Sequence, residues 1–214
     1  MPDRVAMHHS TTSDVTRTLL TYEKDAKTFL RQWGRKKYKR PALLKEWMAL
    51  LPKQGVLLDL GCGAGQDARY LATLGHRVIG LDRTMPLLQF AKRRSSSIPL
   101  VLADMRALPL RDRTLDGIWA AASLIHLPKR TVSRVLVLLQ QLVNPEGLLA
   151  GTFTFGSTSR VKTGGWMPGR YFARWKKDEL ARAFHRADWI VLSIRVVSNQ
   201  ERKGRWINVI AKRK

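Results

Sequence analysis

Residues 56–67 read Val-Leu-Leu-Asp-Leu-Gly-Cys-Gly-Ala-Gly-Gln-Asp. The first five form a short apolar run, which we expect to be a buried strand of a parallel sheet. Glycines at positions 61, 63 and 65 follow, and they allow the backbone to turn tightly and to approach a ligand closely. Residues 66–75 then have the pattern of a helix. The segment therefore predicts a strand, a glycine loop and a helix in succession, with a ligand site at the loop.

The next predicted strand, residues 77–82, ends in a carboxylate, Asp82. A carboxylate at this place can accept hydrogen bonds from both hydroxyls of a ribose. The dinucleotide fingerprint requires glycine at position 66, where this chain has glutamine, and no Gly-Lys-Ser/Thr phosphate loop occurs. Asp59 and Asp82 would repel a pyrophosphate, but they suit a ligand with an ammonium group and a free ribose. The pattern predicts a nucleoside cofactor across the first two strands.

Strands and helices alternate along the rest of the chain, which is typical of βαβ units and a parallel sheet. We expect further strands at 99–104, 115–123, 148–155, 189–197 and 206–213, and helices at 15–33, 41–52, 86–94, 129–143 and 176–187. Residues 144–147 are predicted to form a turn, and residues 156–170, with four glycines, a long surface loop. The expected fold is α/β, a Rossmann-like three-layer sandwich whose mostly parallel seven-stranded sheet ends in an antiparallel C-terminal hairpin.

The charge of the chain is strongly positive. Lys and Arg number 39 against 16 Asp and Glu, which gives a formal net charge of +23. The excess is +7 in residues 1–54, +5 in residues 55–156 and +11 in residues 157–214, so the centre is the least basic part. An excess of this size predicts attraction to polyanions such as nucleic acids, but it does not indicate a fold or a reaction.

Several classes of protein are disfavoured by residues that the chain lacks. Cys62 is the one cysteine, so neither an intrachain disulfide nor a cysteine-cluster zinc site is possible. We expect a cytoplasmic protein, because no apolar run approaches the ~20 residues of a membrane helix and the N-terminus lacks the apolar core of a secretory signal. His8 and His9 lie in a segment rich in serine and threonine, which we interpret as a mobile leader, so we expect no metal site.

The motifs resemble those of a known family. Val-Leu-Leu-Asp-Leu-Gly-Cys-Gly-Ala-Gly-Gln-Asp is similar to motif I of class I S-adenosylmethionine-dependent methyltransferases. Residues 75–84, 102–110, 115–128 and 144–153 resemble the second to fifth strands of that family, in order. Residues 21–26, 169–172 and 205–210 resemble small bacterial members of its type 11/25 group. The resemblance implies a methyltransferase domain at residues 55–214, preceded by an N-terminal helical cap at residues 1–54 whose first 13 residues are the mobile leader.

The resemblance implies S-adenosylmethionine as the cofactor. It also implies a set of cofactor-binding residues, namely Tyr22, Asp59, Gly61, Cys62, Gly63, Asp82, Arg83, Asp104, Met105 and Ala120. In this set the glycine backbone and Asp59 would hold the methionine end, and Asp82 would hold the ribose.

The other implied contacts concern the adenine and the sulfonium. Arg83, Asp104 and the Met105 backbone would lie at the adenine, Ala120 at the sulfonium, and Tyr22 would close over the methionine portion as a lid. The pair Arg83-Thr84 departs from the family, in which a small or apolar residue and serine are commoner; we expect the ribose contact to survive this change.

Candidate catalytic and acceptor-binding residues are few. His126 follows the fourth strand and is the one candidate base near the expected transfer site, although a histidine before Leu-Pro can also serve only to fix a loop. Arg170 and Tyr171 end the long loop and are candidates for contact with the acceptor, with a packing role for Tyr171 as the alternative.

Three functions are compatible with these features. Methyl transfer to a small molecule is what the resemblance most often implies. RNA methylation, in particular of tRNA, is favoured by the net charge and by a similarity of residues 170–172 and 205–206 to tRNA wobble-uridine methyltransferases. A cofactor-binding protein without catalysis is the third. Three other classes of methyltransferase are disfavoured. The fourth strand is not followed by the Asp/Asn-Pro-Pro-aromatic motif of enzymes that methylate amino groups of nucleic acids, and the lone cysteine excludes the two-cysteine route to cytosine C5. The double-glutamate signature of protein-arginine methyltransferases is also missing.

Overall fold

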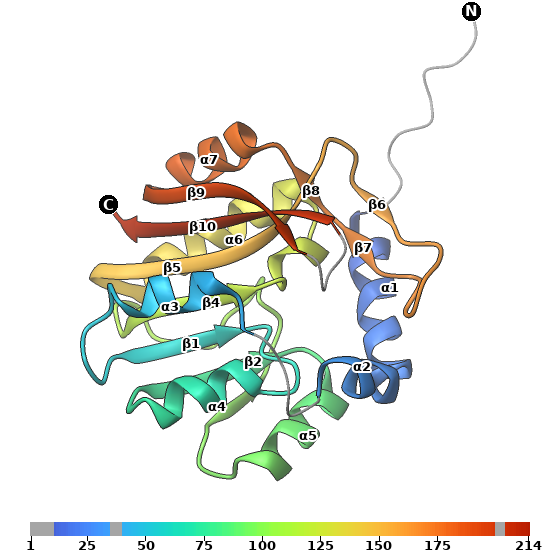
Figure 1. The fold of residues 1–214 in the computed structure, drawn as a ribbon, viewed down its shortest axis with the longest axis horizontal. Coiled ribbons are helices and arrows are strands. Elements are labelled where there is room, and N and C mark those ends of the chain that lie inside the picture. The colour runs from blue at the N-terminus through green and yellow to red at the C-terminus, as the bar shows by residue number, and fades with distance from the viewer. Residues whose placement is uncertain (1–10, 35–39, 200–203) are drawn as a thin grey trace, which may run out of the picture.

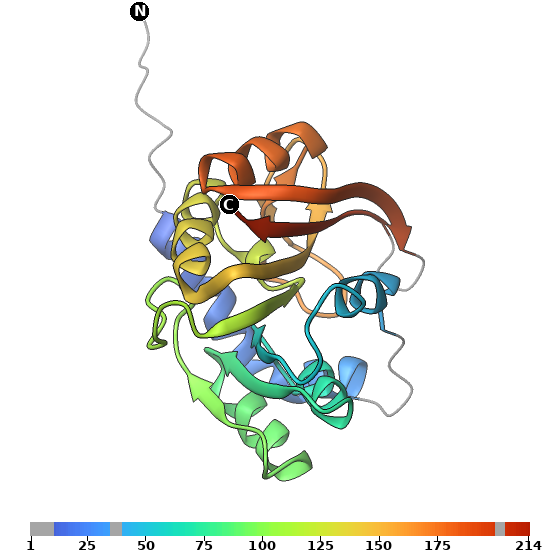
Figure 2. The same ribbon diagram turned by 90° about the vertical axis from the view of Figure 1, so that its left-hand side faces the viewer.

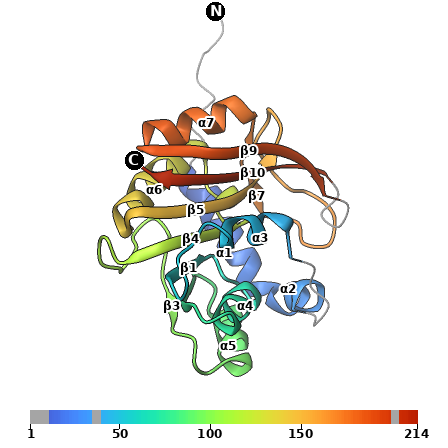
Figure 3. The ribbon, with the colours of Figure 1, turned by 60° about the vertical axis from the view of Figure 1, so that its left-hand side comes forward.

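The computed structural model describes residues 11–34, 40–199 and 204–214. Its main sheet has the order β3-β2-β1-β4-β5-β10-β9, and β8 pairs with β5 beside this path. Figure 3 shows β4, β5, β10 and β9 side by side in this order. These strands are β1 (Val56–Leu60), β2 (Arg77–Asp82), β3 (Leu100–Leu102), β4 (Leu115–Ala121), β5 (Val143–Phe155), β8 (Arg174–Trp175), β9 (Trp189–Asn199) and β10 (Gly204–Arg213). Strands β1 to β5 are parallel, whereas β10 is antiparallel to both β5 and β9. The expected Rossmann-like sheet with an antiparallel C-terminal hairpin is confirmed.

Helices cover both faces of the sheet (Figure 1, Figure 2). They are α1 (Thr11–Lys24), α2 (Ala26–Trp33), α3 (Ala42–Met48), α4 (Gln66–Thr73), α5 (Met85–Arg94), α6 (Lys129–Leu142) and α7 (Lys177–Arg186), with a 3-10 turn at Leu124–His126. One buried cluster joins α6 and α7 to one face, and a second joins α3 and α4 to the other. No helix in the described ranges is long and apolar enough to cross a membrane.

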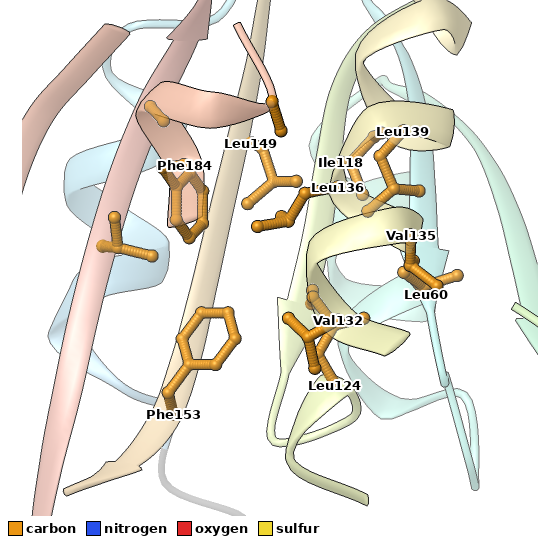
Figure 4. Packing of buried hydrophobic residues seen from close by; sticks show 14 of the residues in the cluster. Leu60, Ile118, Leu124, Val132, Val135, Leu136, Leu139, Leu149, Phe153 and Phe184 are labelled. Carbon is orange, nitrogen blue, oxygen red and sulfur yellow. The ribbon is translucent and has the colours of Figure 1, made fainter. Parts of the chain in front are cut away.

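The larger core lies between α6 and the centre of the sheet (Figure 4). Leu136 and Leu139 of α6 are fully buried, and they belong to the same cluster as Ile118 of β4 and Leu149 of β5. The apolar side chains of α6 recur at three- and four-residue steps, so one stripe of the helix faces the sheet. Burying large aliphatic side chains in this way fixes β4 and β5, whose carboxyl ends lie at the candidate site.

The helix predicted at residues 15–33 is divided at Asp25, whose backbone leaves helical geometry at φ −102° and ψ 21°. The hydrogen bonds Asp25 N to Thr21 O and Phe29 N to Asp25 O still form, so the chain bends without unwinding. Tyr22 before the bend and Phe29 after it pack edge to face, with ring centroids 5.6 Å apart. The amphipathic pattern thus identified the helical residues but not the bend between α1 and α2.

Two other departures from expectation concern the strands. The predicted turn at 144–147 belongs to β5, as an irregularity in its pairing with β4: Leu115 lies opposite Val143, but Gly117 lies opposite Leu148. The long loop predicted at 156–170 carries β6 (Arg160–Val161), which pairs with β7 (Tyr171–Phe172) as a small antiparallel hairpin. Neither the short β8 nor this hairpin was predicted, because two-residue strands leave no periodic signal in a sequence.

Helix α3 packs directly on the sheet. Leu43, Leu44 and Trp47 are buried, and the Trp47 ring stacks on Trp119 of β4 with centroids 5.7 Å apart. The boundary predicted at residue 55 stays a prediction, although this packing joins α3 to the sheet layers. Most of the predicted leader, with His8 and His9, lies outside the described residues.

Candidate cofactor and acceptor site

A cavity of about 640 Å³ opens at the carboxyl ends of the parallel strands. The loops after β1, β2, β3 and β4 form one part of its wall, while α1, α2 and the β6–β7 hairpin form another. In Figure 1, α1, α2 and this hairpin lie at the side of the sheet toward which β1 points. Ligands of open α/β sheets bind at this edge, so the cavity is the candidate site.

The glycine loop folds back onto β2. The backbone N–H groups of Gly61 and Cys62 both donate to the carbonyl of Leu81, at 2.7 and 3.0 Å. Gly61 has a φ of +73°, and a Cβ at this position would lie 2.4 Å from the Cβ of Ser123. Only glycine fits there, since the loop needs a left-handed backbone and has no room for a side chain. Cys62 of the same loop is buried and lines the cavity, and burial raises the pKa of its thiol well above the ordinary value.

The backbone holds the carboxylate of Asp82 in one orientation. Its Oδ2 accepts from Gly63 N and its Oδ1 from Thr84 N, both at 2.8 Å. Burial raises its pKa, while these hydrogen bonds act in the opposite direction. Each carboxylate oxygen can accept a second hydrogen bond, so Asp82 still has acceptor capacity for the hydroxyls of a ligand.

A second carboxylate, Asp59, lies deeper in the same wall. It is 4% exposed, and its Oδ2 accepts from Ala68 N at 3.0 Å. Burial and the neighbouring Asp67 raise its pKa well above the ordinary value. Within residues 11–34, 40–199 and 204–214, no cationic side chain forms an ion pair with Asp59 or Asp82. One buried and one half-buried carboxylate without a cation suit a ligand that brings an ammonium group and hydroxyls, which is the chemistry of S-adenosylmethionine.

Two residues beside Asp59 and the glycine loop, Asp67 and Ser123, were not among the predicted site residues. Asp67 lines the cavity and accepts from the indole N–H of Trp119 at 2.9 Å, and it forms an ion pair with Arg40 at 3.7 Å. Ser123 also lines the cavity, and its Oγ is buried without a hydrogen-bond partner in the described part of the chain. Asp67 follows the glycine loop in the sequence, whereas only the fold brings Ser123 to that loop.

The adenine-binding residues implied by the resemblance form a charged cluster. Although burial opposes it, hydrogen bonds from Arg106 lower the pKa of Asp104, and the Arg106 Nη2 lies 2.7 Å from its Oδ2. Arg83 forms an ion pair with the same oxygen at 2.9 Å. Arg83, Asp104 and Met105 all line the cavity, so their predicted positions at the cofactor are compatible with the structure. No pattern in the sequence indicated Arg106 as the partner of Asp104.

Ala120 does not line the cavity. It is fully buried in the core of β4, and the residues that follow it, Ala121 and Ala122, line the wall. Successive side chains of a strand point to opposite faces, so a shift of one residue decides which one faces a ligand. Ala122 has a φ of +57°, an uncommon value for a residue other than glycine.

His126 lies in a directional chain of hydrogen bonds. Its Nδ1 lies 2.8 Å from the carbonyl of Tyr171, and because a carbonyl only accepts, Nδ1 carries the proton. Nε2 lies 2.9 Å from the Tyr22 hydroxyl and is then the acceptor. The Arg170 Nη1 donates to the same hydroxyl at 3.3 Å. Tyr22, His126 and Arg170 are 44 to 148 residues apart in sequence, and the structure brings all three to one wall of the cavity.

The imidazole of His126 is neutral at ordinary pH. Burial lowers its pKa to about 4, the hydrogen bond to Tyr171 acts in the opposite direction, and the charge of Arg170 lowers it further. Its one basic nitrogen already accepts from Tyr22. A ring with this pKa and this partner is a weak base, and it is well placed to fix the tyrosine hydroxyl.

The β6–β7 hairpin supplies the remaining candidates. Arg170 is 5% exposed and lies against the rings of Trp166, Phe172 and Tyr22, with its guanidinium carbon 4.5, 5.3 and 5.6 Å from their centroids. Tyr171 is not among the lining residues; its backbone N–H donates to the Thr18 hydroxyl at 2.9 Å and its carbonyl accepts from His126. Tyr171 therefore anchors the hairpin to α1 through its backbone.

The comparisons with known proteins agree with this geometry. Residues 57–147 match the family model Methyltransf_25, described as a methyltransferase domain. A malonyl-[acyl-carrier protein] O-methyltransferase of Pseudescherichia vulneris is 33% identical over 96 residues, which are 45% of this chain and 38% of that protein. The methyltransferase GfsG of Streptomyces halstedii is 36% identical over 101 residues, which are 44% of this chain and 36% of that protein. The chain thus matches less than two fifths of the length of these curated relatives.

A solved structure is similar over the whole chain. The 1,6-didemethyltoxoflavin-N1-methyltransferase of Burkholderia thailandensis, with 1,6-didemethyltoxoflavin and S-adenosylhomocysteine bound, has a TM-score of 0.75 and 19% identity. The match covers 100% of this chain and 93% of that one. At this identity the likeness concerns the fold alone.

Proposed function

Because residues 57–147 match a methyltransferase-domain family model, we propose that this protein is a class I S-adenosylmethionine-dependent methyltransferase of the type 11/25 group and that it transfers a methyl group to a small-molecule acceptor. The observation that carries the proposal is the glycine loop together with the buried carboxylate of Asp59 and the half-buried carboxylate of Asp82, neither of which has a cationic partner among the described side chains. Their place at the ends of β1 and β2 is the nucleoside site of such sheets.

The cofactor site is formed by backbone and carboxylates. Gly61 and Gly63 allow close approach to the methionine end, Asp59 attracts its ammonium group, and Asp82 accepts from the ribose hydroxyls. Asp104 and Met105 contribute the adenine end. When bound, S-adenosylmethionine supplies a methyl group that is already activated by a sulfonium. The tasks left to this chain are to position the acceptor and to exclude water.

Two observations support a small acceptor. One relative is named as a malonyl-[acyl-carrier protein] O-methyltransferase, and the solved neighbour is named as a 1,6-didemethyltoxoflavin-N1-methyltransferase with 1,6-didemethyltoxoflavin bound. In this chain α1, α2 and the β6–β7 hairpin close over the ends of the strands, so that the acceptor space is a cavity lined by aromatic side chains. A recessed cavity with aromatic side chains in its wall suits a small molecule better than a folded polyanion.

Within this proposal His126 is a positioning residue. A neutral imidazole that donates to Tyr171 and accepts from Tyr22 fixes the tyrosine ring, which lines the cavity beside Arg170. The tyrosine then shapes the space in which the acceptor and the methionine end of the cofactor meet. A pKa of about 4 makes direct proton abstraction by His126 inefficient at neutral pH.

The proposal is tested in two steps. Calorimetry should show binding of S-adenosylmethionine, and Asp82→Ala should weaken it by about 100-fold or more, because two ribose hydroxyls lose a charged acceptor. Asp112→Ala removes an exposed carboxylate outside the cavity and is the matched control. Unchanged affinity in the Asp82 variant would contradict the assignment of the site.

The second step identifies the acceptor class. Labelled cofactor is incubated with a metabolite extract and, separately, with cellular RNA. Transfer of label to small molecules is the expected result. Transfer to RNA alone would replace this proposal by the RNA alternative that the net charge of +23 favours.

A further inference from the structure

The hairpin wall of the cavity carries two cations without carboxylate partners. Arg170 and Lys162 both line the cavity, and no carboxylate in the described ranges forms an ion pair with either of them. The backbone pairs the two positions directly: Lys162 N donates to Arg170 O at 2.8 Å, and Gly169 N donates to Lys162 O at 2.7 Å. One hairpin thus places both charges beside the acceptor space.

The guanidinium of Arg170 is buried with donors to spare. Nε donates to the carbonyl of Met167 at 3.0 Å, and Nη1 donates to the Tyr22 hydroxyl at 3.3 Å. A guanidinium has five N–H groups, so these two bonds leave three, and Nη2 has no hydrogen-bond partner in the part of the chain that the structure describes. Burying a cation that lacks an anion is costly, and neighbouring aromatic faces offset only part of the cost. The missing partner is an anion.

The shape of the donor set indicates which anion. Two parallel N–H groups of a guanidinium match the two oxygens of a carboxylate, which is the geometry of the strongest charge-assisted pairs. Around Arg170 the wall is aromatic, with the rings of Trp166, Phe172 and Tyr22 beside the guanidinium. This combination suits a carboxylate on an apolar body.

We propose that the methyl acceptor is a small apolar carboxylate, bound through a bidentate ion pair with Arg170 and assisted by the ammonium of Lys162. The inference rests on the proposed methyltransferase function, since it assigns the acceptor of that reaction. It explains why a weak base suffices in this cavity. A carboxylate oxygen is already an anion at neutral pH, so it would attack the methyl carbon as the bond between that carbon and the sulfonium breaks, S-adenosylhomocysteine would leave, and no proton has to be removed.

The test uses the full-length protein loaded with S-adenosylhomocysteine. Calorimetry compares 2-naphthoate with 2-naphthamide, which has the same shape without the charge. We expect naphthoate to bind at least about 10-fold more tightly, because charge-assisted hydrogen bonds replace neutral ones. Arg170→Gln should weaken naphthoate about 10- to 100-fold and leave naphthamide unchanged, and Lys162→Gln should have a smaller effect in the same direction.

Arg160→Gln is the matched control. It removes one positive charge from the same hairpin, but Arg160 is exposed and does not line the cavity, so naphthoate affinity should not change. Since Arg170 also holds the hairpin through Met167 and Tyr22, each variant is first checked for binding of S-adenosylhomocysteine. If Arg170→Gln fails this check, Arg170→Lys, which keeps the charge and loses the fork, takes its place with an expected weakening of naphthoate of at least about 3-fold.

The outcomes separate the two proposals. Binding of S-adenosylhomocysteine with equal affinities for naphthoate and naphthamide overturns the carboxylate inference and leaves the methyltransferase proposal standing. Tighter binding of 2-naphthyl phosphate than of naphthoate, sensitive to Arg170, also overturns the assignment to a carboxylate. Absence of S-adenosylhomocysteine binding overturns the proposed function and the inference with it.

Discussion

The two walls of the cavity differ in charge and in the way they are held. The glycine-loop wall carries Asp59 and Asp82, and backbone N–H groups within 19 residues fix both carboxylates. The hairpin wall carries Arg170 and Lys162, and its contacts with Tyr22 and His126 join residues far apart in the chain. The acidic wall is thus a local structure, whereas the basic wall exists only once α1, the turn after β4 and the hairpin have met.

This division also separates the net charge of the chain from the chemistry of the site. The chain has a formal charge of +23, yet the cofactor wall is acidic and its carboxylates have raised pKa values because they are buried. The basic wall uses only two of the 39 Lys and Arg residues. Overall charge indicates attraction to polyanions, but the local arrangement of a few buried groups decides which ligand fits.

The largest effect is expected where the acidic wall is tightest. Gly61→Ala should lower the free energy of unfolding by about 3 kcal/mol, because the new Cβ meets Ser123 and the backbone stays left-handed. Adding Ser123→Gly to this variant should recover part of the loss, since it removes the colliding Cβ. Urea denaturation of the single and double variants measures both effects. Equal stability of the Gly61 variant and the unmodified protein would show that the loop is not held as described.

A pH dependence is expected from the basic wall. His126 has a folded pKa of about 4, below its ordinary value of 6.5, so the unfolded chain binds a proton first as the pH falls. Its contribution to stability is therefore present above pH 6.5 and is lost between about pH 6.5 and 4, by about 2 kcal/mol. Thermal unfolding at a series of pH values should show this loss, and His126→Gln should flatten it.

The pH dependence of stability has to be compared between the unmodified protein and His126→Gln, because the carboxylates of the acidic wall change stability with pH in the opposite direction. Asp59 and Asp82 have raised pKa values, so their burial favours the folded state most at low pH and costs stability as the pH rises. Both carboxylates remain in His126→Gln, and the difference between the two curves isolates the histidine. A curve of unchanged slope in the variant would contradict burial of a neutral His126.

A smaller effect is expected at the link between α1 and the hairpin. Tyr22→Phe keeps the ring and removes the hydroxyl that joins Arg170 to His126. It leaves the buried Nε2 of His126 without its donor, which should cost about 1–2 kcal/mol of stability. Affinity for 2-naphthoate should fall with it, while affinity for S-adenosylhomocysteine should stay within about 3-fold, because the hydroxyl serves the basic wall. Calorimetry measures both affinities. An equal loss of affinity for the two ligands would contradict the assignment of the Tyr22 hydroxyl to the basic wall alone.

The smallest effect is expected at Asp59. Asp59→Asn keeps an oxygen to accept from Ala68 and removes a buried charge that has no cation beside it. The unliganded protein should become more stable by about 1 kcal/mol, or about 2–4 °C in melting temperature. The same variant should bind S-adenosylmethionine more weakly, because its ammonium group loses a counter-charge. A lower melting temperature without ligand would indicate that the Asp59 charge is compensated in the fold.

Much of the acidic wall follows from the sequence alone. Strand β1, the glycine loop and α4 are consecutive, and each has a local signal: an apolar run, residues that tolerate left-handed backbone, and a helical period. Asp82 closes β2 at the residue where the strand was expected to end. Such features depend on neighbours in the chain, and hydrophobic periodicity and glycine placement record them directly.

The basic wall was decided by the tertiary structure. The sequence singled out Tyr22, His126 and Arg170 one by one, but it held no sign that they form one chain of hydrogen bonds, that Arg170 is buried without a carboxylate, or that Ala121 rather than Ala120 faces the cavity. The bend at Asp25 and the position of β10 between β5 and β9 have the same origin. Each arises from contacts between distant segments. The burial that lowers the pKa of His126 exists only after those segments have packed together, and the same packing buries the guanidinium of Arg170 without a carboxylate partner among the described residues.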